Sequence, residues 1–500
     1  MSDERADVVI VGAGHNGLVA AAYLARAGLS VVVCEGRGVV GGAAVTEELA
    51  PGFRVSTASY SLSLLRPDIY NDLGLAARGL VVMPKDPQLF VPLPDGRHFF
   101  VWRDAERTRD ELNEFHSGEG DAYLRWSSFL DDAVRTLRPL VDDPQPPPLA
   151  DVRRSVSDQI WRLAVAGSAA STVEEFFDAP EVQGAFASQG IIGTWAGVRD
   201  EGTAWVLTYH GIGGEINGSD GTWAYVRGGM GSVTRAIAGA ARDAGAVVST
   251  DAPVDEILMD RGRAAGVRLE SRRVIRARVV LSNAHPVTTL TKLVRGGELD
   301  RDWRTPGCVL KVNLALRELP DFVAAPGTGP QHHGTVEIAP SIDYLQDAFE
   351  DARRGEPSRR PFMEIFMQSA VDRTLVDGDG HVLSAFTQYV PPTTPDWPAV
   401  RERATSSVID TLASYAPNLR DAIVACDALG PPELEERFGL VGGNIFHGEI
   451  TPEQSFGNRF GYRTPIEGLY LCGSGASPGG GVMGAAGRNA ARVVLVDLQQ

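Results

Sequence analysis

The chain has 500 residues, of which 43% are hydrophobic and 22% charged, and its mean hydropathy is −0.08. This composition excludes a disordered chain and a polytopic membrane protein, and it supplies a large core without disulfides or metal ions. The formal charge of −17 argues against nucleic acid as a partner, because a strongly acidic chain repels phosphate backbones.

The N-terminal sequence, MSDERADVVIVGAG, is acidic and passes at once into an apolar stretch, which predicts neither a signal peptide nor an Arg-rich transit peptide. The chain contains no run of about 18 uncharged apolar residues, the length that a spanning helix needs. We therefore expect a cytoplasmic location; peripheral membrane contact stays open, because a short amphipathic patch does not alter these counts. The four cysteines show neither disulfide-framework nor zinc-site spacing, so no metal is expected.

The first 35 residues predict a strand, a glycine turn, a helix and a second strand. Val8–Val11 is a short apolar run, and Gly12–Gly17 follows it as a glycine turn. Leu18–Ala27 is typical of an alanine-rich helix that ends at Gly28, and Leu29–Cys34 of a second strand. This order predicts one βαβ unit with a right-handed crossover.

Helical patterns dominate from about 66 to 220, among them Glu119–Val141 and Val152–Ala170. Between these two we expect Asp142–Ala150 to form an exposed extended loop, because it is rich in proline. A second αβ block, from about 222 to 290, predicts one helix followed by three strands: Ser232–Ala244, Ala246–Thr250, Ala264–Leu269 and Val274–Ser282.

The last block predicts a strand at Leu469–Cys472, a glycine loop at Gly473–Gly484 and a helix at Ala485–Leu498. Three nucleotide-binding-like segments are thus separated by two different inserts. This organisation predicts an α/β fold in which a discontinuous Rossmann-like domain carries an inserted α+β domain. The expected boundaries are 1–65, 222–300 and 440–500 for the cofactor domain, and 66–221 and 301–439 for the substrate-binding domain.

Residues 12–17 read GAGHNG and match the GxGxxG dinucleotide fingerprint, with an apolar strand before it and a helix after it. Gly12 permits the tight turn, Gly14 lets the backbone approach a pyrophosphate, and Gly17 lets helix and strand pack closely. The N-terminus of the helix offers free N–H groups and a positive dipole end to the phosphates. Glu35, at the end of the next strand, suits an adenosine ribose.

Two further glycine clusters favour FAD over NAD. Gly41 and Gly42 form a second turn for phosphate shortly after Glu35, which NAD-only Rossmann domains do not need. The loop 473–481, GSGASPGGG, lets backbone N–H groups approach a flat ring, and the following helix directs its dipole at the N1/O2 side of an isoalloxazine. Residues 479–484, GGGVMG, also read GxGxxG, but only the motif at 12–17 directly follows a predicted strand, so we expect no separate NAD(P)H domain.

Together these segments resemble the FAD-binding fold shared by amine oxidases, phytoene desaturases and Rab GDP-dissociation inhibitors. More closely, the chain resembles the phytoene-desaturase-like group that includes pyridine nucleotide-disulfide oxidoreductase domain-containing protein 2. The matching stretches span the chain: VVIVGAGHNGLVAAAYLARAG, GGAAVTEELAPGFRVSTASYSLSLLRP, VRGGMGSVTRAIA, VVLSNAHP, ERFGLVGGNIFHGE and YRTPIEGLYLCGSGASPGGGVMGAAGRNAA. The resemblance carries over no disulfide chemistry, because the chain has no CxxC.

The resemblance implies FAD as the cofactor, with a role for each matching residue. It implies that Gly12, Gly14 and Gly17 contact the pyrophosphate and that Glu35 binds the ribose. The adenosine diphosphate would lie along Gly36, Arg37, Gly41 and Gly42, and the adenine against Val254. The flavin ring and ribityl chain would contact Gly473, Gly481, Val482 and Met483.

Lys311 and His447 are the candidate catalytic residues. Lys311 interrupts an apolar strand pattern at 308–316, where a lysine is costly to bury without a partner. The resemblance implies a lysine that hydrogen-bonds through water to flavin N5, and the alternative is a lysine on an edge strand. His447, in the loop 442–449, suits a base or a hydrogen-bond partner of the substrate, and the alternative is a structural role.

The candidate substrate-binding residues are Tyr60, His332, His333, Tyr344 and Ser477. Relatives often read HPGGG in the last block, whereas this chain has Ser477 before the proline, so we expect this serine beside the flavin in place of a histidine. An unaided serine does not act as a base near neutral pH, which puts a mechanism that needs that histidine in doubt.

We expect an FAD-dependent oxidase or dehydrogenase that removes two electrons from a C–C or C–N bond of a largely apolar small molecule, with dioxygen or a quinone as the electron acceptor. The alternatives are an amine oxidase, a flavin-dependent saturase or isomerase, and a non-catalytic binding protein of the GDP-dissociation-inhibitor kind. The sequence leaves the oligomeric state undetermined.

Overall fold

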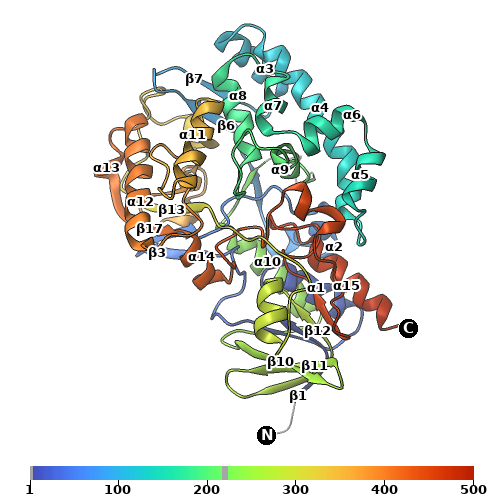
Figure 1. Ribbon diagram of the computed structural model, residues 1–500. Helices are drawn as coiled ribbons and strands as arrows, with labels where there is room; N and C mark the ends of the chain where they lie inside the picture. Colours follow the sequence, from blue (N-terminus) through green and yellow to red (C-terminus); the bar gives the residue numbers. More distant parts are fainter. Residues whose placement is uncertain (1–3, 215, 217–222, 500) are drawn as a thin grey trace.

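The computed structural model describes residues 4–214, 216 and 223–499. Two large sheets organise these residues (Figure 1), and the first of them carries the parallel strands. Its strand order is β10-β11-β12-β1-β2-β9, with β18 paired to β12. The strands span Glu4–Val11 (β1), Val31–Cys34 (β2), Val247–Ser249 (β9), Val254–Asp260 (β10), Arg263–Leu269 (β11), Val274–Ser282 (β12) and Leu469–Leu471 (β18).

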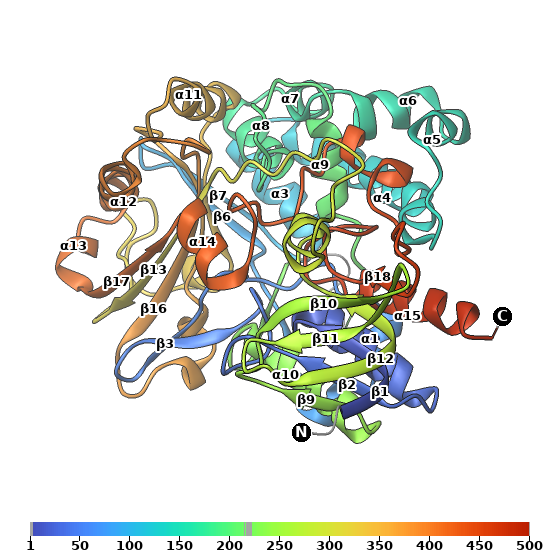
Figure 2. The same ribbon diagram turned by 60° about the horizontal axis from the view of Figure 1, so that its bottom comes forward.

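The core of the first sheet is formed by strands that are buried on both faces. β1 pairs in parallel with β2 and β12, and its residues Val8–Ile10 are fully buried, as the continuous apolar run predicts. Helix α1 (His15–Arg26) follows β1 and packs against α10 (Gly231–Asp243) and α15 (Ala485–Asp497). These elements come from three distant stretches of chain and lie together in the lower part of Figure 2.

The second sheet is largely antiparallel and has the order β17-β13-β16-β15-β14-β6-β7. Only the β14–β6 pair in it is parallel. Its strands span Leu89–Pro92 (β6), His98–Val101 (β7), Val309–Leu316 (β13), Thr335–Ile338 (β14), Phe362–Phe366 (β15), His381–Gln388 (β16) and Ile423–Leu429 (β17). Two short ribbons complete the strands: Thr46–Ala50 (β3) with Phe53–Ser56 (β4), and Val82–Pro84 (β5) with Ala224–Val226 (β8).

Most of the other helices gather around the second sheet and above it (Figure 2). They are α3 (Ala105–Phe115), α4 (Glu119–Asp142), α5 (Leu149–Ser155), α6 (Asp158–Trp161), α7 (Ala169–Glu174), α8 (Pro180–Ala187), α9 (Thr203–His210), α11 (Ile342–Arg353), α12 (Trp397–Tyr415), α13 (Leu419–Ala422) and α14 (Pro431–Phe438). Helix α2 (Pro67–Asp72) instead packs in the core of the first sheet, and its Asp68 pairs with Arg488 of α15. Within the described part of the chain, no helix has the length and apolar character to cross a bilayer.

The α/β class is confirmed, and β12 has the predicted bounds. The single helix predicted at 152–170 is wrong, because two serines begin new helices inside it. The side chain of Ser157 accepts the N–H of Ile160 at the start of α6, and Ser168 forms a capping box at the start of α7. The loop predicted at 142–150 ends early, since α5 begins at Leu149, and the strand β10 was not predicted as a strand.

Candidate functional site

A cavity of about 430 Å³ lies between the two sheets. At one end it is lined by residues at the carboxyl ends of β1, β2 and β12, which are Gly12, Glu35 and Asn283. At the other end it is lined by Lys311 of β13 and Phe386 of β16. The carboxyl edge of a parallel sheet is where α/β folds bind their ligands, so the cavity is the candidate site.

The glycine turn after β1 is packed too tightly for side chains. Gly12 has φ +87°, and a Cβ on Gly17 would lie 2.4 Å from the Gly12 carbonyl oxygen. A Cβ on Gly14 would lie 2.6 Å from Nδ2 of Asn283. Asn283 also accepts the N–H of Gly17 through Oδ1, at 2.9 Å. Sequence reasoning missed Asn283, although it stands inside the matching stretch VVLSNAHP.

Glu35 is held rigidly at the same end of the cavity. Its Oε2 accepts the N–H of Ala13 at 2.7 Å, and its Oε1 accepts the N–H of Arg37 at 2.9 Å. The Arg37 guanidinium pairs with Glu47 and lies over the ring of Phe438, 5.1 Å from its centroid. The Arg37 Nη1 atom is buried without a hydrogen-bond partner. This donor is therefore available to a ligand in the cavity.

The second glycine turn rests on the first. The N–H of Gly41 donates to the carbonyl of Ala13 at 2.9 Å, and Gly41 and Gly42 have φ values of +128° and +57°. A Cβ on Gly42 would lie 3.5 Å from the Cα of Gly14. The two turns thus present bare backbone to the cavity, as a phosphate group requires.

The C-terminal glycine loop closes the cavity from another side. Asn16 Nδ2 donates to Oγ of Ser474 at 3.3 Å, which links this loop to the start of α1. Ser474, Gly481 and Val482 line the cavity, and the latter two have φ values of +107° and +61°. Arg459 joins this loop to its neighbour by donating to the carbonyls of Ser474 and Phe446, at 2.8 and 2.5 Å.

These residues fit a dinucleotide. Backbone from three glycine turns faces one cavity, Glu35 is fixed with both oxygens at its rim, and the Arg37 Nη1 donor has no protein partner. His15, in the first turn of α1, also has an unpartnered buried atom, Nε2. Unpaired buried polar atoms are costly, so a ligand that satisfies them is the simplest explanation.

Lys311 is a buried residue of a central strand, so the edge-strand alternative is wrong. Its strand, β13, lies between β17 and β16, and its side chain is 2% exposed. Nζ donates to Oδ1 of Asn313 at 2.5 Å, and Asn313 is fixed by Ser384 Oγ and by the carbonyl of Thr57. Burial lowers the pKa of Lys311 to about 7, which makes its neutral amine accessible near neutral pH.

The walls near Lys311 are mainly aromatic and aliphatic. The rings of Tyr60 and Trp223 are parallel within 4°, with centroids 6.1 Å apart, and His210 stacks on Trp223 at 5.7 Å. Lys311 Nζ lies 5.7 Å from the centroid of the Tyr60 ring. The remaining apolar lining includes Leu64, Ile192, Val309, Phe386, Ile445 and Phe446.

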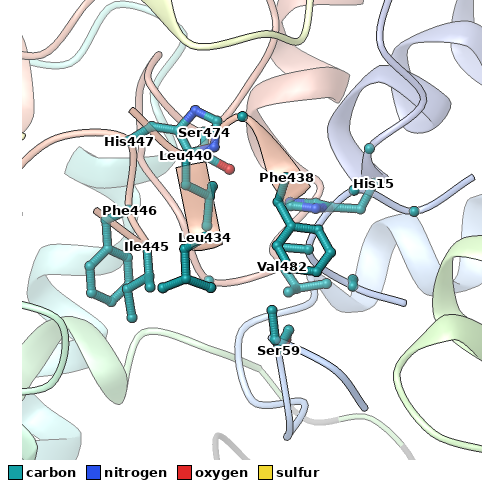
Figure 3. Close-up of a pocket in the computed structure, with 18 of the residues that line it drawn as sticks. His15, Ser59, Leu434, Phe438, Leu440, Ile445, Phe446, His447, Ser474 and Val482 are labelled. Carbon is teal, nitrogen blue, oxygen red and sulfur yellow. The ribbon is translucent and has the colours of Figure 1, made fainter. Parts of the chain in front are cut away.

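His447 lines the cavity, and it lies beside His285, which was not predicted as a site residue. Its ring stacks on that of His285, with centroids 5.2 Å apart (Figure 3 shows His447 beside Ser474). Burial lowers the pKa of His447 to about 3 and that of His285 to about 2, so both are neutral at pH 7. His447 Nδ1 and His285 Nε2 have no hydrogen-bond partner.

Several predicted site residues do not line the cavity. Nε2 of His332 lies 2.8 Å from the carbonyl of Pro320, and Tyr344 donates its hydroxyl proton to the carbonyl of Pro361. The expectation that they and His333 line the substrate cavity is corrected accordingly. Ser477 is also outside the lining: it is 1% exposed, and its carbonyl accepts the hydroxyl of Tyr462.

Five residues of the cofactor prediction stand behind the lining rather than in it: Gly17, Gly36, Val254, Gly473 and Met483. Two of them make close contacts within the protein. A Cβ on Gly473 would lie 2.4 Å from the Asn283 carbonyl oxygen, and the Met483 carbonyl accepts the N–H of Arg66. Among the residues that the structure describes, no group of three or more His, Cys, Asp or Glu side chains is arranged to hold a metal ion.

Comparison with known proteins agrees with this geometry. Residues 17–307 match the family model described as flavin containing amine oxidoreductase. The chain is 38% identical to pyridine nucleotide-disulfide oxidoreductase domain-containing protein 2 of Mus musculus, over 99% of this chain and 94% of that one. It is 25% identical to a neurosporene-forming phytoene desaturase of Cereibacter sphaeroides, over 96% and 92%.

Among solved structures, a double mutant of putrescine oxidase superposes with a TM-score of 0.63 at 19% identity, covering 100% of both chains. This likeness concerns the fold, which agrees with the sheets and the glycine turns described above. The chain therefore belongs to the flavin-containing amine oxidoreductase family, and its cofactor is FAD.

Proposed function

We propose that this protein oxidises a largely apolar small molecule by removing two electrons and two protons from a C–C or C–N bond. The observation that carries the proposal is the chemistry of the cavity around Lys311. Of the described lining residues, only Glu35 and Glu436 are carboxylates. Glu35 lies among the glycine turns, and Glu436 lies on α14 two residues before Phe438, the ring beneath Arg37.

The apolar walls favour a substrate that makes no ion pair. An ammonium group bound near Lys311 would meet aromatic rings and another amine, and none of the described lining residues there provides a carboxylate. The similarity to a phytoene desaturase supports desaturation. The amine oxidase alternative takes support from the putrescine oxidase fold and from the aromatic rings, which also attract cations.

Gly12, Gly14, Gly41 and Gly42 would hold the pyrophosphate of FAD, Glu35 and Arg37 its adenosine end, and Gly481 and Val482 its ring system. When bound, FAD supplies the acceptor for a hydride, which carries two electrons and one proton. The chain itself has to position the substrate, exclude water and take the second proton. Lys311 lines the cavity, and its Nζ donates a hydrogen bond to Asn313.

An anaerobic screen tests the proposal. Polyenes, amines and cyclic imine precursors are mixed with the FAD-loaded protein, and bleaching of the flavin absorbance is recorded. We expect apolar compounds with an oxidisable C–C or C–N bond to bleach the flavin. Bleaching by charged amines alone would favour the amine oxidase, and a protein that retains no FAD after reconstitution would favour a binding protein.

The electron acceptor is tested in the same cuvette. We propose dioxygen or a quinone, because only the GxGxxG at 12–17 directly follows a strand and the sequence predicts no second nucleotide domain. Admission of air to the reduced protein should restore the oxidised spectrum if dioxygen is the acceptor. A spectrum that recovers only after a quinone is added identifies the quinone. A bound flavin that reduces an alkene when supplied with electrons would identify a saturase.

A further inference from the structure

A group of charged residues is buried behind the substrate end of the cavity, within the apolar core of the second sheet. It consists of Lys85, just after β5, Glu337 of β14 and Glu364 of β15, which are 2%, 0% and 2% exposed. Glu337 and Glu364 stand opposite each other on neighbouring strands, a register that brings Cβ atoms to about 5 Å. Removing charged groups from water costs free energy, and none of these three residues is among those assigned to the cofactor.

The two carboxyl groups differ in their hydrogen bonds. Glu364 accepts the Tyr60 hydroxyl on Oε2 and the Gln189 amide on Oε1, both at 2.9 Å, which stabilises its ionised form. Neither oxygen of Glu337 has a hydrogen-bond partner, and both burial and Glu364 raise the pKa of this acid well above its ordinary value. Glu337 is therefore the protonated member, because two adjacent carboxylates do not both ionise.

Lys85 completes the group. Its Nζ donates to Oγ1 of Thr335 at 2.6 Å and lies 4.7 Å from the centroid of the Phe366 ring. Burial lowers the pKa of Lys85 to about 7 and raises that of Glu364. The titratable groups that face Glu364 are thus Lys85, Glu337 and Tyr60. Because these groups interact, their protonation states are coupled.

Tyr60 connects this group to the cavity. Its ring lines the cavity and packs against Phe386, with centroids 5.3 Å apart, while its hydroxyl donates to Glu364. Among the described residues, Tyr60 is the one that both lines the cavity and bonds directly to a carboxylate of the group. A proton taken up at Tyr60 therefore has a hydrogen-bonded route out of the apolar cavity.

We propose that Lys85, Glu337 and Glu364 form a buried proton-binding cluster that serves the cavity through Tyr60 and takes up the proton released by substrate oxidation. This inference rests on the proposed function. One C–H bond breaks and its electron pair leaves with hydrogen as hydride to the flavin. The neighbouring C–H or N–H bond breaks, its electron pair forms the new double bond, and its proton passes to Tyr60 Oη. The hydroxyl proton of Tyr60 moves to Glu364, which becomes a carboxylic acid.

The state of the cluster is tested by infrared spectroscopy, which needs neither FAD nor substrate. We expect the wild-type protein at pH 7 to show a carbonyl-stretching component of a protonated carboxylic acid that Glu337→Gln lacks. Glu337→Leu is measured beside it, because it removes the same acid without introducing an amide. A carboxylic acid region that is unchanged in both variants overturns the proposal, whatever the substrate is.

The route is tested by the rate of flavin reduction against pH, with a compound from the screen. We expect Tyr60→Phe and Glu364→Gln to slow reduction at least tenfold and to alter its pH profile, while FAD content is unchanged. Tyr389→Phe is the matched control, because Tyr389 is also buried and bonds to the carbonyl of Ala196 away from the cavity. A wild-type rate and pH profile in Tyr60→Phe or Glu364→Gln overturns the route.

The two failures are distinguishable. A screen in which no compound bleaches the flavin contradicts the proposed function and with it the uptake of a substrate proton. The infrared result concerns Glu337 alone and contradicts only the cluster.

Discussion

At the scale of single residues, Lys311 is a buried amine in the cavity wall that is held by a hydrogen bond. Its strand neighbours are apolar, whereas its Nζ is directed by Asn313, a side chain that is itself fixed on both sides. We expect Lys311→Met to retain FAD, because Lys311 belongs to the second sheet and not to the glycine turns, and to slow flavin reduction or reoxidation by about 10²-fold or more. Stopped-flow absorbance measures both half-reactions.

Lys292→Met serves as the control for Lys311→Met, since Lys292 is exposed and outside the cavity lining. Its rates should match those of the wild type. Equal rates in both half-reactions for Lys311→Met would remove Lys311 from the mechanism.

The His285–His447 pair leads to a prediction about pH. Both pKa values are depressed to about 2 and 3, so neither imidazole gains a proton as the pH falls from 8 to 5. We expect His447→Ala to lower turnover without lowering FAD content, and to leave the shape of the pH profile over this range unchanged. Steady-state rates with the flavin-to-protein ratio check both. Loss of FAD with normal turnover per flavin would mark His447 as a structural residue.

At the scale of elements, the contact between β1 and α1 sets the geometry of the phosphate turn. A Cβ on Gly17 would clash with the Gly12 carbonyl oxygen, and this backbone atom cannot move away by a side-chain rotation. We expect Gly17→Ala to lose bound FAD because the turn has to widen. The flavin-to-protein absorbance ratio measures this. Gly461→Ala is the control, since nothing lies within 4 Å of its added Cβ, and its FAD content should equal that of the wild type.

Local sequence patterns predict some elements and not others. The run Val8–Val11 and the alanine-rich helix after it are specified by neighbouring residues, so the βαβ unit could be predicted. The helix at 152–170 could not, because Ser157 and Ser168 act as caps only once their own backbone leaves the helix. Asn283 and His285 could not be assigned because their contacts, with Gly17 and His447, join residues more than 150 positions apart.

The same limit explains the substrate-side predictions. His332 and Tyr344 have the right chemistry for a cavity, but both contact carbonyl groups in loops, those of Pro320 after β13 and Pro361 before β15. Tyr60 and Lys311 do line the cavity, and Lys311 carried a local signal, because it interrupts an apolar strand pattern. Composition alone does not separate these two cases, since burial depends on the tertiary arrangement.

At the scale of the whole molecule, FAD binding and folding are coupled. Residues from the first, middle and last parts of the chain line one cavity, so a ligand bound there stabilises all of them together. We expect FAD at 100 times its dissociation constant to raise the free energy of unfolding by about 2.7 kcal/mol and to raise the Tm. Thermal melts across an FAD series check this. A Tm that does not depend on FAD concentration would contradict the shared site.

The link between Asn16 and Ser474 also has a consequence for how the protein is made. Ser474 follows Asn16 by 458 positions, so the loop after β18 is synthesised long after the first glycine turn that it contacts. Before residues 474–482 are synthesised, the chain lacks Ser474, Gly481 and Val482, which line the same cavity as the first two glycine turns. We therefore expect stable binding of FAD only after residues 474–482 have been synthesised.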